Sequence, residues 1–423
     1  MAEVRPGDEH RTPRNLYAFG LTSFFNDTAS EMAYWVLPAF LSSIGAGPAR
    51  LGLIEGVAES VVSVAKLFSG YLADRWSRRK PLVVAGYVVA NAVKPLLALV
   101  TWWGQVLAIR FTDRLAKGAR GTARDVMIAE SETPARMGSA YGLIQAMDSA
   151  GAIAGPMLAL LVLARGGTMR QVFWGAAIPG SLCVLVALLG IRETHKARFG
   201  QVPESSSDSR AGHRPALLRP AKAVPASVVA GNTALSGGFY TVLWVVTLFS
   251  LGNSSDMFLV LRAESVGIPT SFAPLLGLTF NLTYTLAAWP AGKLSDRVSR
   301  RTVAALGYLV FGAVYFAFAL GSSVALIWGA MALYGLFYAL TAPVLKALVV
   351  ESVAPQMRGR ALGIYFSVTS VAALLASVIT GGLWTFYGPR LPLSLSAGGA
   401  VVCAGLLLVR RDPGGPAFEV TAR

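Results

Sequence analysis

The stretch GYLADRWSRRKP, residues 70–81, and the stretch GKLSDRVSRRTV, residues 292–303, carry one pattern of residues twice. Each begins with Gly, places Asp-Arg four and five residues later, and continues through Ser to Arg-Arg. Another residue repeats at nearly the same interval, since Glu130 returns as Glu351. A single Arg-rich loop is an ordinary topology signal. The recurrence of this loop at nearly the same interval as another repeated residue indicates a chain built of two related halves.

The residues around both stretches are mostly apolar. Hydrophobic residues make up 54% of the 423 residues and charged residues only 14%, which excludes an ordinary water-soluble protein. Apolar runs of about 19 to 29 residues recur along the chain, and each is long enough to cross roughly 30 Å of hydrocarbon as a helix. We therefore predict an all-α membrane protein with twelve transmembrane helices, at residues 15–43, 51–73, 81–102, 104–127, 138–163, 171–191, 238–262, 271–293, 302–320, 324–348, 359–384 and 391–409.

The predicted helices fall into two groups of six, which we expect to form two bundles related by pseudo-twofold symmetry. Most Lys and Arg residues outside the spans lie on the side of the linker and the two ends, so both termini are expected in the cytoplasm of a bacterial cell whose inner membrane holds the protein. This placement explains the net charge of +15 without nucleic acid as a partner. The expected divisions are a cytoplasmic N-terminus 1–14, a first bundle 15–191, a linker 192–237, a second bundle 238–410 and a tail 411–423.

The repeated stretch resembles the loop motif of the major facilitator superfamily, Gly-x-x-x-Asp-Arg/Lys-x-Gly-Arg-Arg/Lys. Ser77 and Ser299 stand where that motif usually has Gly. The resemblance covers residues 15–410 and implies a transporter of two six-helix bundles whose loops close a cytoplasmic gate. The residues that match are Gly70, Asp74, Arg75, Arg78 and Arg79 in the first copy, and Gly292, Asp296, Arg297, Arg300 and Arg301 in the second.

The chemistry of this motif can be read from its residue types. A carboxylate such as that of Asp74 can accept from the free N–H groups at the start of a neighbouring helix, where the helix dipole favours negative charge. By resemblance, that helix belongs to the second bundle. We expect the arginines to bind carboxylates or carbonyls across the gap between the bundles.

A stripe of charges marks the fourth predicted helix. Arg110, Arg114 and Lys117 lie at i, i+4 and i+7, with Asp113 beside them. A charge at the membrane centre costs about 2.5–3.5 kcal/mol on insertion scales, so the stripe should line a wet cavity or meet carboxylates. The other charged residues within the spans are predicted partners or cavity residues: Asp27, Glu31, Glu55, Glu59, Lys94 and Asp148.

One or two of these carboxylates are predicted to carry protons. Burial and a neighbouring Arg act in opposite senses on the proton affinity of a carboxylate, so its charge can switch as the cavity changes. The proton-coupling candidates are Asp27, Glu31, Arg110, Asp113 and Asp148. The alternative is a static network of ion pairs that only orients the helices, although buried pairs rarely repay their desolvation.

The second half contributes fewer candidates. Asp256 occupies the position equivalent to Glu31, and Tyr334 and Tyr338 share a helix face that can contact an amphiphilic or aromatic substrate. An aromatic stripe that only packs against a neighbouring helix is the alternative. The predicted substrate cavity thus comprises Glu55, Glu59, Lys94, Arg114, Lys117, Asp256, Tyr334 and Tyr338.

The fifth predicted helix carries Gly142, Gly151, Gly155 and Pro156, which resemble the antiporter motif of the superfamily. That motif is found in proton-coupled exporters, but its final Gly-Gly is Ala-Leu here. Small residues four apart permit close helix contact, and Pro156 cannot donate to the carbonyl four residues earlier. Simple helix packing is the alternative interpretation.

Together these patterns predict a secondary active transporter that moves a small organic solute by alternating access, as a proton-coupled efflux antiporter. The alternatives are a proton-coupled symporter importing an anionic metabolite and a membrane sensor without transport. The sequence contains no His-Glu-x-x-His, Cys-x-x-Cys or Gly-x-Ser-x-Gly motif, so we expect no enzyme activity, no cofactor and no metal. The expected partners are a small-molecule substrate, protons and the lipid bilayer, and the protein is expected to be a monomer.

Overall fold

The computed structural model describes residues 14–75, 78–131, 137–193, 235, 237–353 and 357–409. Within these ranges the regular structure is entirely helical. The predicted N-terminal segment up to residue 13, nearly all of the predicted linker and the tail from residue 410 lie outside the described residues.

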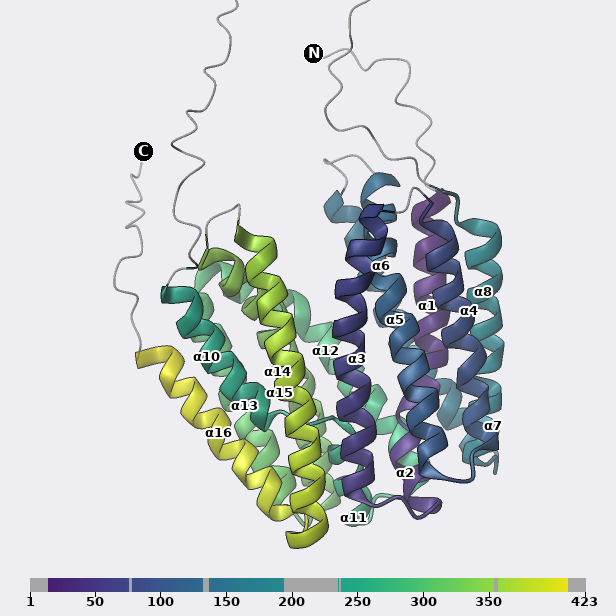
Figure 1. Ribbon diagram of the computed structural model, residues 1–423. Helices are drawn as coiled ribbons and strands as arrows, with labels where there is room; N and C mark the ends of the chain where they lie inside the picture. Colours follow the sequence, from purple (N-terminus) through teal and green to yellow (C-terminus); the bar gives the residue numbers. More distant parts are fainter. Residues whose placement is uncertain are drawn as a thin grey trace, which may run out of the picture.

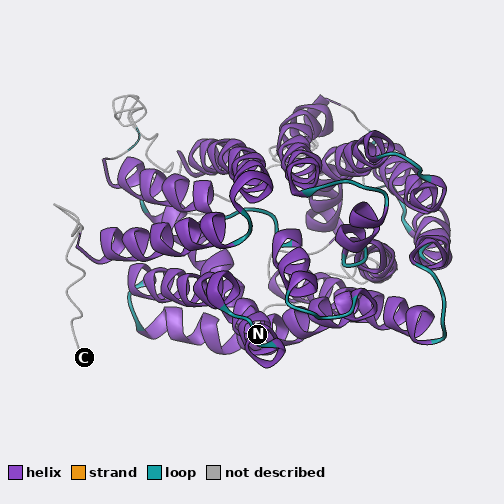
Figure 2. Cartoon of the chain, turned by 90° about the horizontal axis from the view of Figure 1, so that it is seen from below, coloured by secondary structure: helices purple, strands orange, loops and turns teal. Residues whose placement is uncertain are grey.

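The first bundle contains nine helical segments, counted within the described residues (Figure 1). In chain order they are α1 (Arg14–Tyr34), α2 (Leu37–Ser43), α3 (Pro48–Arg75), α4 (Lys80–Val93), η1 (Lys94–Leu99), α5 (Trp103–Ser131), α6 (Met137–Ala164), α7 (Met169–Gly175) and α8 (Ala177–Gly190). The second bundle contains α10 (Gly237–Gly252), α11 (Met257–Ser265), η3 (Thr270–Phe272), α12 (Ala273–Arg297), α13 (Arg300–Leu320), α14 (Val324–Glu351), α15 (Arg358–Tyr387) and α16 (Arg390–Val409). Figure 2, viewed along the helices, shows the two groups beside each other.

Each predicted span coincides with one helix or with consecutive helical segments. Among the described residues, eight segments are long and apolar enough to cross a membrane by length and hydropathy. The other four spans correspond to α1 with α2, α3, α5 and α12. Helices α1 and α5 contain charged residues of the cavity described below, and α3 contains two acids that pair with α5, which lowers the mean hydropathy of these three spans. Hydropathy alone therefore supports eight membrane spans. The count of twelve spans also relies on where the remaining helices lie in the structure.

Several predicted continuous helices are interrupted. The first span breaks after Tyr34, and α2 restarts with Pro38 in its first turn, where proline needs no N–H partner. The third span changes from α-helix to 3-10 helix at Lys94, directly before Pro95. The seventh span breaks between α10 and α11 at Asn-Ser-Ser-Asp, residues whose side chains compete for backbone hydrogen bonds.

The two bundles repeat one pattern of neighbours. Helix α5 packs on α3 and α4, as α14 packs on α12 and α13, and α1 packs on α8 as α10 packs on α16. An ion pair is repeated as well: Arg79 Nη1 lies 2.6 Å from Glu130 Oε1, and Arg300 Nη1 lies 2.5 Å from Glu351 Oε1. Both partners are shifted by 221 residues between the copies. The duplication seen in the sequence is thus also present in the contacts.

The bundles meet mainly through α3 with α15 and α6 with α12. On α3 the backbone N–H of Ala49 donates to Thr385 Oγ1 at 3.2 Å, and Ser60 Oγ donates to the carbonyl of Ser370 at 3.3 Å. Gly52 permits this approach, since a Cβ there would lie 2.2 Å from the carbonyl oxygen of Ser377. These contacts lie in the half of α3 that is nearer α2 and α11, where Figure 1 shows the bundles close together.

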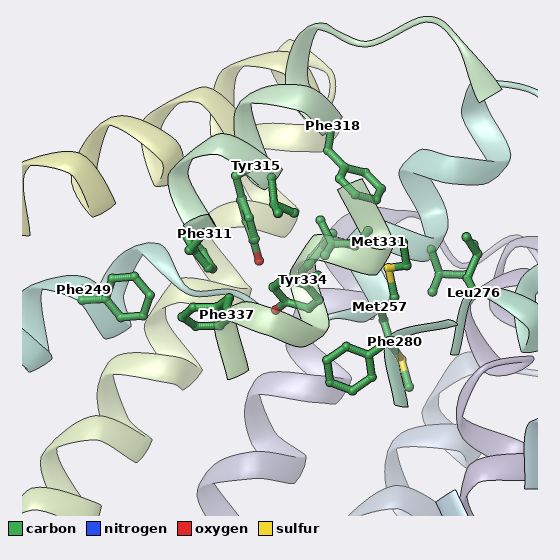
Figure 3. Packing of buried hydrophobic residues seen from close by; sticks show 14 of the residues in the cluster. Phe249, Met257, Leu276, Phe280, Phe311, Tyr315, Phe318, Met331, Tyr334 and Phe337 are labelled. Atoms are coloured by element: carbon green, nitrogen blue, oxygen red, sulfur yellow. The ribbon is translucent and has the colours of Figure 1, made fainter. Parts of the chain in front are cut away.

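Aromatic packing fixes α14 within the second bundle (Figure 3). The Phe249 ring stacks on Tyr308 at 3.8 Å between centroids, and Phe311 stacks on Tyr315 at 3.9 Å. Phe337 of α14 contacts Phe311 edge-on at 4.9 Å. Such pairs hold rings in defined orientations beyond simple burial. This core therefore sets the direction of the side chains that α14 turns toward the other bundle.

Candidate functional site

A charged cavity of about 70 Å³ lies within the first bundle, between α1, α5 and the start of η1. Its walls include five basic and three acidic side chains: Lys94, Arg110, Arg114, Lys117 and Arg120, with Asp27, Glu31 and Asp113. The predicted stripe on α5 therefore faces this cavity. A site between the two halves is usual for transporters built from repeats, but every residue that lines this cavity belongs to the first bundle. The reason is that the charges of α1 and α5 face each other inside one bundle.

Three ion pairs join α5 to its neighbours. Arg110 Nη2 lies 2.7 Å from Glu55 Oε1, and the Glu55 side chain is only 1% exposed. Arg114 lies 3.4 Å from Glu59, and Lys94 lies 3.7 Å from Asp113. Removing one partner of a buried pair such as Arg110 and Glu55 typically costs about 3–5 kcal/mol.

These partners differ from the predicted proton site, which joined Arg110 to a carboxylate of α1. Helix α3 is the neighbour that packs most closely on α5, so its acids Glu55 and Glu59 reach the arginines first. The carboxylates that the sequence placed at a similar depth in α1 are left without these partners.

The two carboxylates of α1 have only neutral hydrogen-bond donors. Asn26 Nδ2 donates to Asp27 Oδ1 at 3.0 Å, and Trp35 Nε1 donates to Glu31 Oε2 at 2.7 Å. Within the described residues, no Lys or Arg nitrogen lies within 4.0 Å of either carboxylate. Asp27 and Glu31 thus line a cavity rich in cations without forming an ion pair of their own.

The glycines of α6 set the position of these carboxylates. A Cβ at Gly155 would lie 2.6 Å from the carbonyl oxygen of Thr28 and 2.8 Å from Cβ of Glu31. A Cβ at Gly151 would lie 3.1 Å from Cβ of Asp27. The antiporter-like glycines therefore let α6 pack directly against the acidic face of α1. Gly142 of the same motif has open space where a Cβ would lie.

Pro156 leaves a carbonyl on α6 for the other bundle. Proline has no N–H, so the carbonyl of Ala152 has no donor from the next turn of its own helix. Asn281 of α12 donates to this carbonyl through Nδ2 at 3.1 Å. The proline of the motif thus creates an acceptor that joins the two bundles.

Trp35 forms a second contact between the bundles. Its indole is 1% exposed and lies against Gly277 of α12, where a Cβ would come within 2.2 Å of the ring. The same indole donates its N–H to Glu31. A residue that sequence analysis did not single out therefore connects an α1 carboxylate to the surface of the second bundle.

Comparison with known proteins agrees with this architecture. The family model of the Major Facilitator Superfamily matches residues 19–262 and 243–422. The chain belongs to the major facilitator superfamily. Members of this superfamily carry small molecules across membranes, so the protein is an integral membrane transporter.

Three relatives illustrate the range of similarity. An uncharacterized MFS-type transporter of Methanocaldococcus jannaschii is 31% identical over 411 residues, which cover 95% of this chain and 96% of the relative. The multidrug resistance protein MdtL of Escherichia coli O157:H7 is 24% identical over 252 residues, 59% of each chain. A crystal structure of a mutant of the nucleoside transporter NupG has a TM-score of 0.72 and 15% identity, covering 93% of this chain and 98% of that one. The structural likeness shows the fold of this superfamily.

The gate motif of this transporter differs in part from its prediction. Among the described residues, Arg79 pairs with Glu130 and Arg300 pairs with Glu351, and each of these pairs lies within one bundle. Arg78 is exposed, and a Cβ at Gly292 would meet no atom within 4 Å. Arg297 and Arg301 lie at the end of α12 and the start of α13. The surroundings of four predicted gate residues lie outside the described part of the structure: Gly70, Asp74, Arg75 and Asp296.

The remaining candidates are divided between the two bundles. Asp148 of α6 is half-buried and interacts electrostatically with Asp27 and Arg124, but it does not line the cavity. Asp256 lies in the second bundle, where Tyr334 donates to it.

Arg120 was missed by the sequence analysis. It lies seven residues, about two helical turns, after Asp113 on α5, and this spacing could have revealed it. Its guanidinium donates to Asn26 Oδ1 at 3.1 Å and lies 4.4 Å over the Tyr87 ring.

Proposed function

We propose that this transporter is a proton-coupled antiporter that exports a small organic solute by alternating access. One observation carries the proposal: Glu31 has no ion-pair partner among the described residues, and its carboxylate binds the indole that contacts the second bundle. A carboxylate without a counter-ion can gain or lose a proton as its surroundings change.

The coupling would act through Trp35. A charged Glu31 is a stronger acceptor for the indole N–H than a neutral one, because hydrogen bonds to ionised groups are shorter and stronger. Loss of that charge weakens the bond that holds the indole against Gly277. Protonation of Glu31 in the first bundle thus weakens a contact with the second bundle that exists in only one arrangement of the two bundles. Coupling requires such a dependence of one arrangement on protonation.

The charge distribution sets the orientation of the chain, and one comparison supports export. The Lys and Arg residues outside the spans favour a cytoplasmic location for both termini, in a bacterial inner membrane. The contacts between α3 and α15 described above would then lie on the outer side, so the structure corresponds to a transporter closed to the outside. The similarity to a multidrug resistance protein favours an exporter.

The test is transport by the full chain in proteoliposomes that contain a pH-sensitive dye. With the cytoplasmic side outward and an acid interior, export coupling predicts that a transported solute enters while protons leave. Adding cationic, neutral and anionic organic solutes in turn should make the lumen more alkaline for at least one class.

A matched pair of variants links this flux to the cavity. Glu31→Gln should abolish the dependence on pH, whereas Asp125→Asn should keep it, because Asp125 is exposed at the end of α5 and pairs with Arg124. Flux without any proton movement, or equal coupling in Glu31→Gln, would reject the proposal.

The second candidate is a symporter that imports an anionic metabolite. The excess of basic over acidic side chains in the cavity favours this alternative, since it would attract an anion. The same vesicles without an imposed pH gradient separate the two, because symport predicts that an added anion and protons enter together and the lumen becomes more acid.

A further inference from the structure

The second bundle contains a carboxylate without a counter-ion. Asp256 lies in the segment between α10 and α11, and the hydroxyl groups of Tyr334 and Tyr338 donate to its Oδ1 at 2.6 Å and 3.2 Å. Its Oδ2 receives only a long bond of 3.4 Å from Tyr338. Within the described residues, no Lys or Arg nitrogen lies within 4.0 Å of this carboxylate. The nearby Arg262 is bound elsewhere, to the carbonyls of Phe318 and Gly321.

Aromatic rings cluster around the two tyrosines that donate to this carboxylate. The centroid of the Tyr338 ring lies 5.4 Å from Tyr334, 5.2 Å from Phe280 and 6.3 Å from Tyr284. Figure 3 shows Tyr334 and Phe280 beside each other in this cluster. Tyr338 and Tyr284 are only half-buried, so part of each side chain remains accessible.

Further polar atoms at the same helix break have no partner. Asn253 Oδ1 and Ser254 Oγ are buried and make no hydrogen bond to the described residues. Both lie within three residues of Asp256 in the unwound segment. Unwound segments within membrane helices commonly bind ions or charged substrate groups, because their backbone and side-chain oxygens are not used by a helix. These oxygens would accept hydrogen bonds from a cation held at Asp256.

The first bundle does not neutralise this site. Arg110 of the first bundle has its guanidinium 5.5 Å from the Tyr34 ring, and Glu55 already neutralises it. Ser255, beside Asp256, donates to the other oxygen of Glu55 at 3.5 Å. The second bundle therefore presents a net negative charge at a place where the first presents a neutral pair.

We propose that Asp256 and its aromatic neighbours bind the positively charged group of the substrate, an organic ammonium or similar onium cation on an apolar body. The carboxylate supplies the counter-charge, and its Oδ2 is the oxygen most available to it. The rings of Tyr338 and Phe280 supply faces that attract a cation and apolar surface for its body. This inference rests on the proposed export of organic solutes and narrows their class.

The test is equilibrium binding of tetraphenylphosphonium to the purified full chain in detergent, without any pH gradient. Tetraphenylborate has the same shape and the opposite charge, so wild type should bind the phosphonium and not the borate. Asp256→Asn keeps the shape of the side chain and should weaken phosphonium binding about tenfold or more, the usual effect of losing a charged partner. Binding of both ions with equal affinity would overturn the inference.

Three further variants guard against a merely structural effect. Tyr338→Phe keeps the ring and should bind within a few-fold of wild type, whereas Tyr338→Leu should lose roughly two- to fivefold from the missing ring face. Asp125→Asn, far from the site at the end of α5, should bind as wild type. If Asp256→Asn binds the phosphonium within about twofold of wild type, the inference is rejected.

The outcome is separate from that of the proposed transport. Binding without a gradient does not need Glu31, so Asp256-dependent binding would stand even if Glu31→Gln left the pH dependence of transport unchanged. Conversely, pH-driven flux that Glu31→Gln abolishes, together with unchanged binding by Asp256→Asn, would overturn only this inference.

Discussion

The contact between Pro156, Ala152 and Asn281 allows a quantitative test. Asn281 Nδ2 donates at 3.1 Å to a carbonyl that has no donor in its own helix, because position 156 is proline. Asn281→Ala leaves that partly buried acceptor without a partner, at a cost of about 1–3 kcal/mol. Pro156→Ala restores a backbone N–H four residues after Ala152, so the carbonyl then has an intrahelical donor. In the Pro156→Ala background, Asn281→Ala should therefore cost less than about 1 kcal/mol.

The assay is equilibrium unfolding in mixed micelles for the four proteins of this double-mutant cycle. The coupling between the two substitutions should be about 1–2 kcal/mol. Pro343→Ala serves as the control background, because Pro343 is a helix-internal proline of α14 that is exposed. There, Asn281→Ala should retain its full cost. An equal cost of Asn281→Ala in all three backgrounds would refute the idea that the proline creates the acceptor that Asn281 satisfies.

The remaining predictions concern helix contacts and ion pairs of the first bundle. Gly155→Ala should lower transport strongly, since its Cβ would lie 2.6 Å from a backbone carbonyl of α1, whereas Gly142→Ala should transport as wild type because that position is open. Solute flux in proteoliposomes measures both, and equal activity of the two variants would contradict the packing argument. Glu130→Gln should destabilise the bundle by about 3–5 kcal/mol because Arg79 would keep a buried charge without its carboxylate. Unfolding in mixed micelles checks this value, and a loss below about 1 kcal/mol would show that other groups stabilise the arginine. Trp35→Phe removes the indole donor to Glu31 and should weaken the response of flux to pH more than the flux itself; an unaltered pH profile would exclude the indole from coupling.

The sequence predicted the helices well because length and hydropathy act locally. Apolar runs had to form helices in a membrane, where each backbone polar group needs a partner within its own segment. The interruptions were not predicted. The break at the α10–α11 segment arises from four polar residues inside an otherwise apolar run, and the run was long enough to hide it.

The candidate site was predicted in its residue types and less well in its pairs. The spacing of Arg110, Arg114 and Lys117 predicted a charged wall, and the structure has these side chains on the cavity. Their partners depended on which helix packs beside α5, and one chain's sequence does not reveal helix neighbours. The contact of Asn281 with α6 could have been anticipated in part, because the carbonyl freed by Pro156 needed a donor from somewhere.

The repeated pair of Arg79 with Glu130 and Arg300 with Glu351 bears on the energetics of the transport cycle. Each pair ties two helix ends of a single six-helix unit, so neither has to break when the units swing relative to each other. Each unit can then move as a rigid body. The energy barrier to its movement arises from the contacts at the interface between the two units. Added salt that weakens these two ion pairs should therefore not change the turnover rate through them.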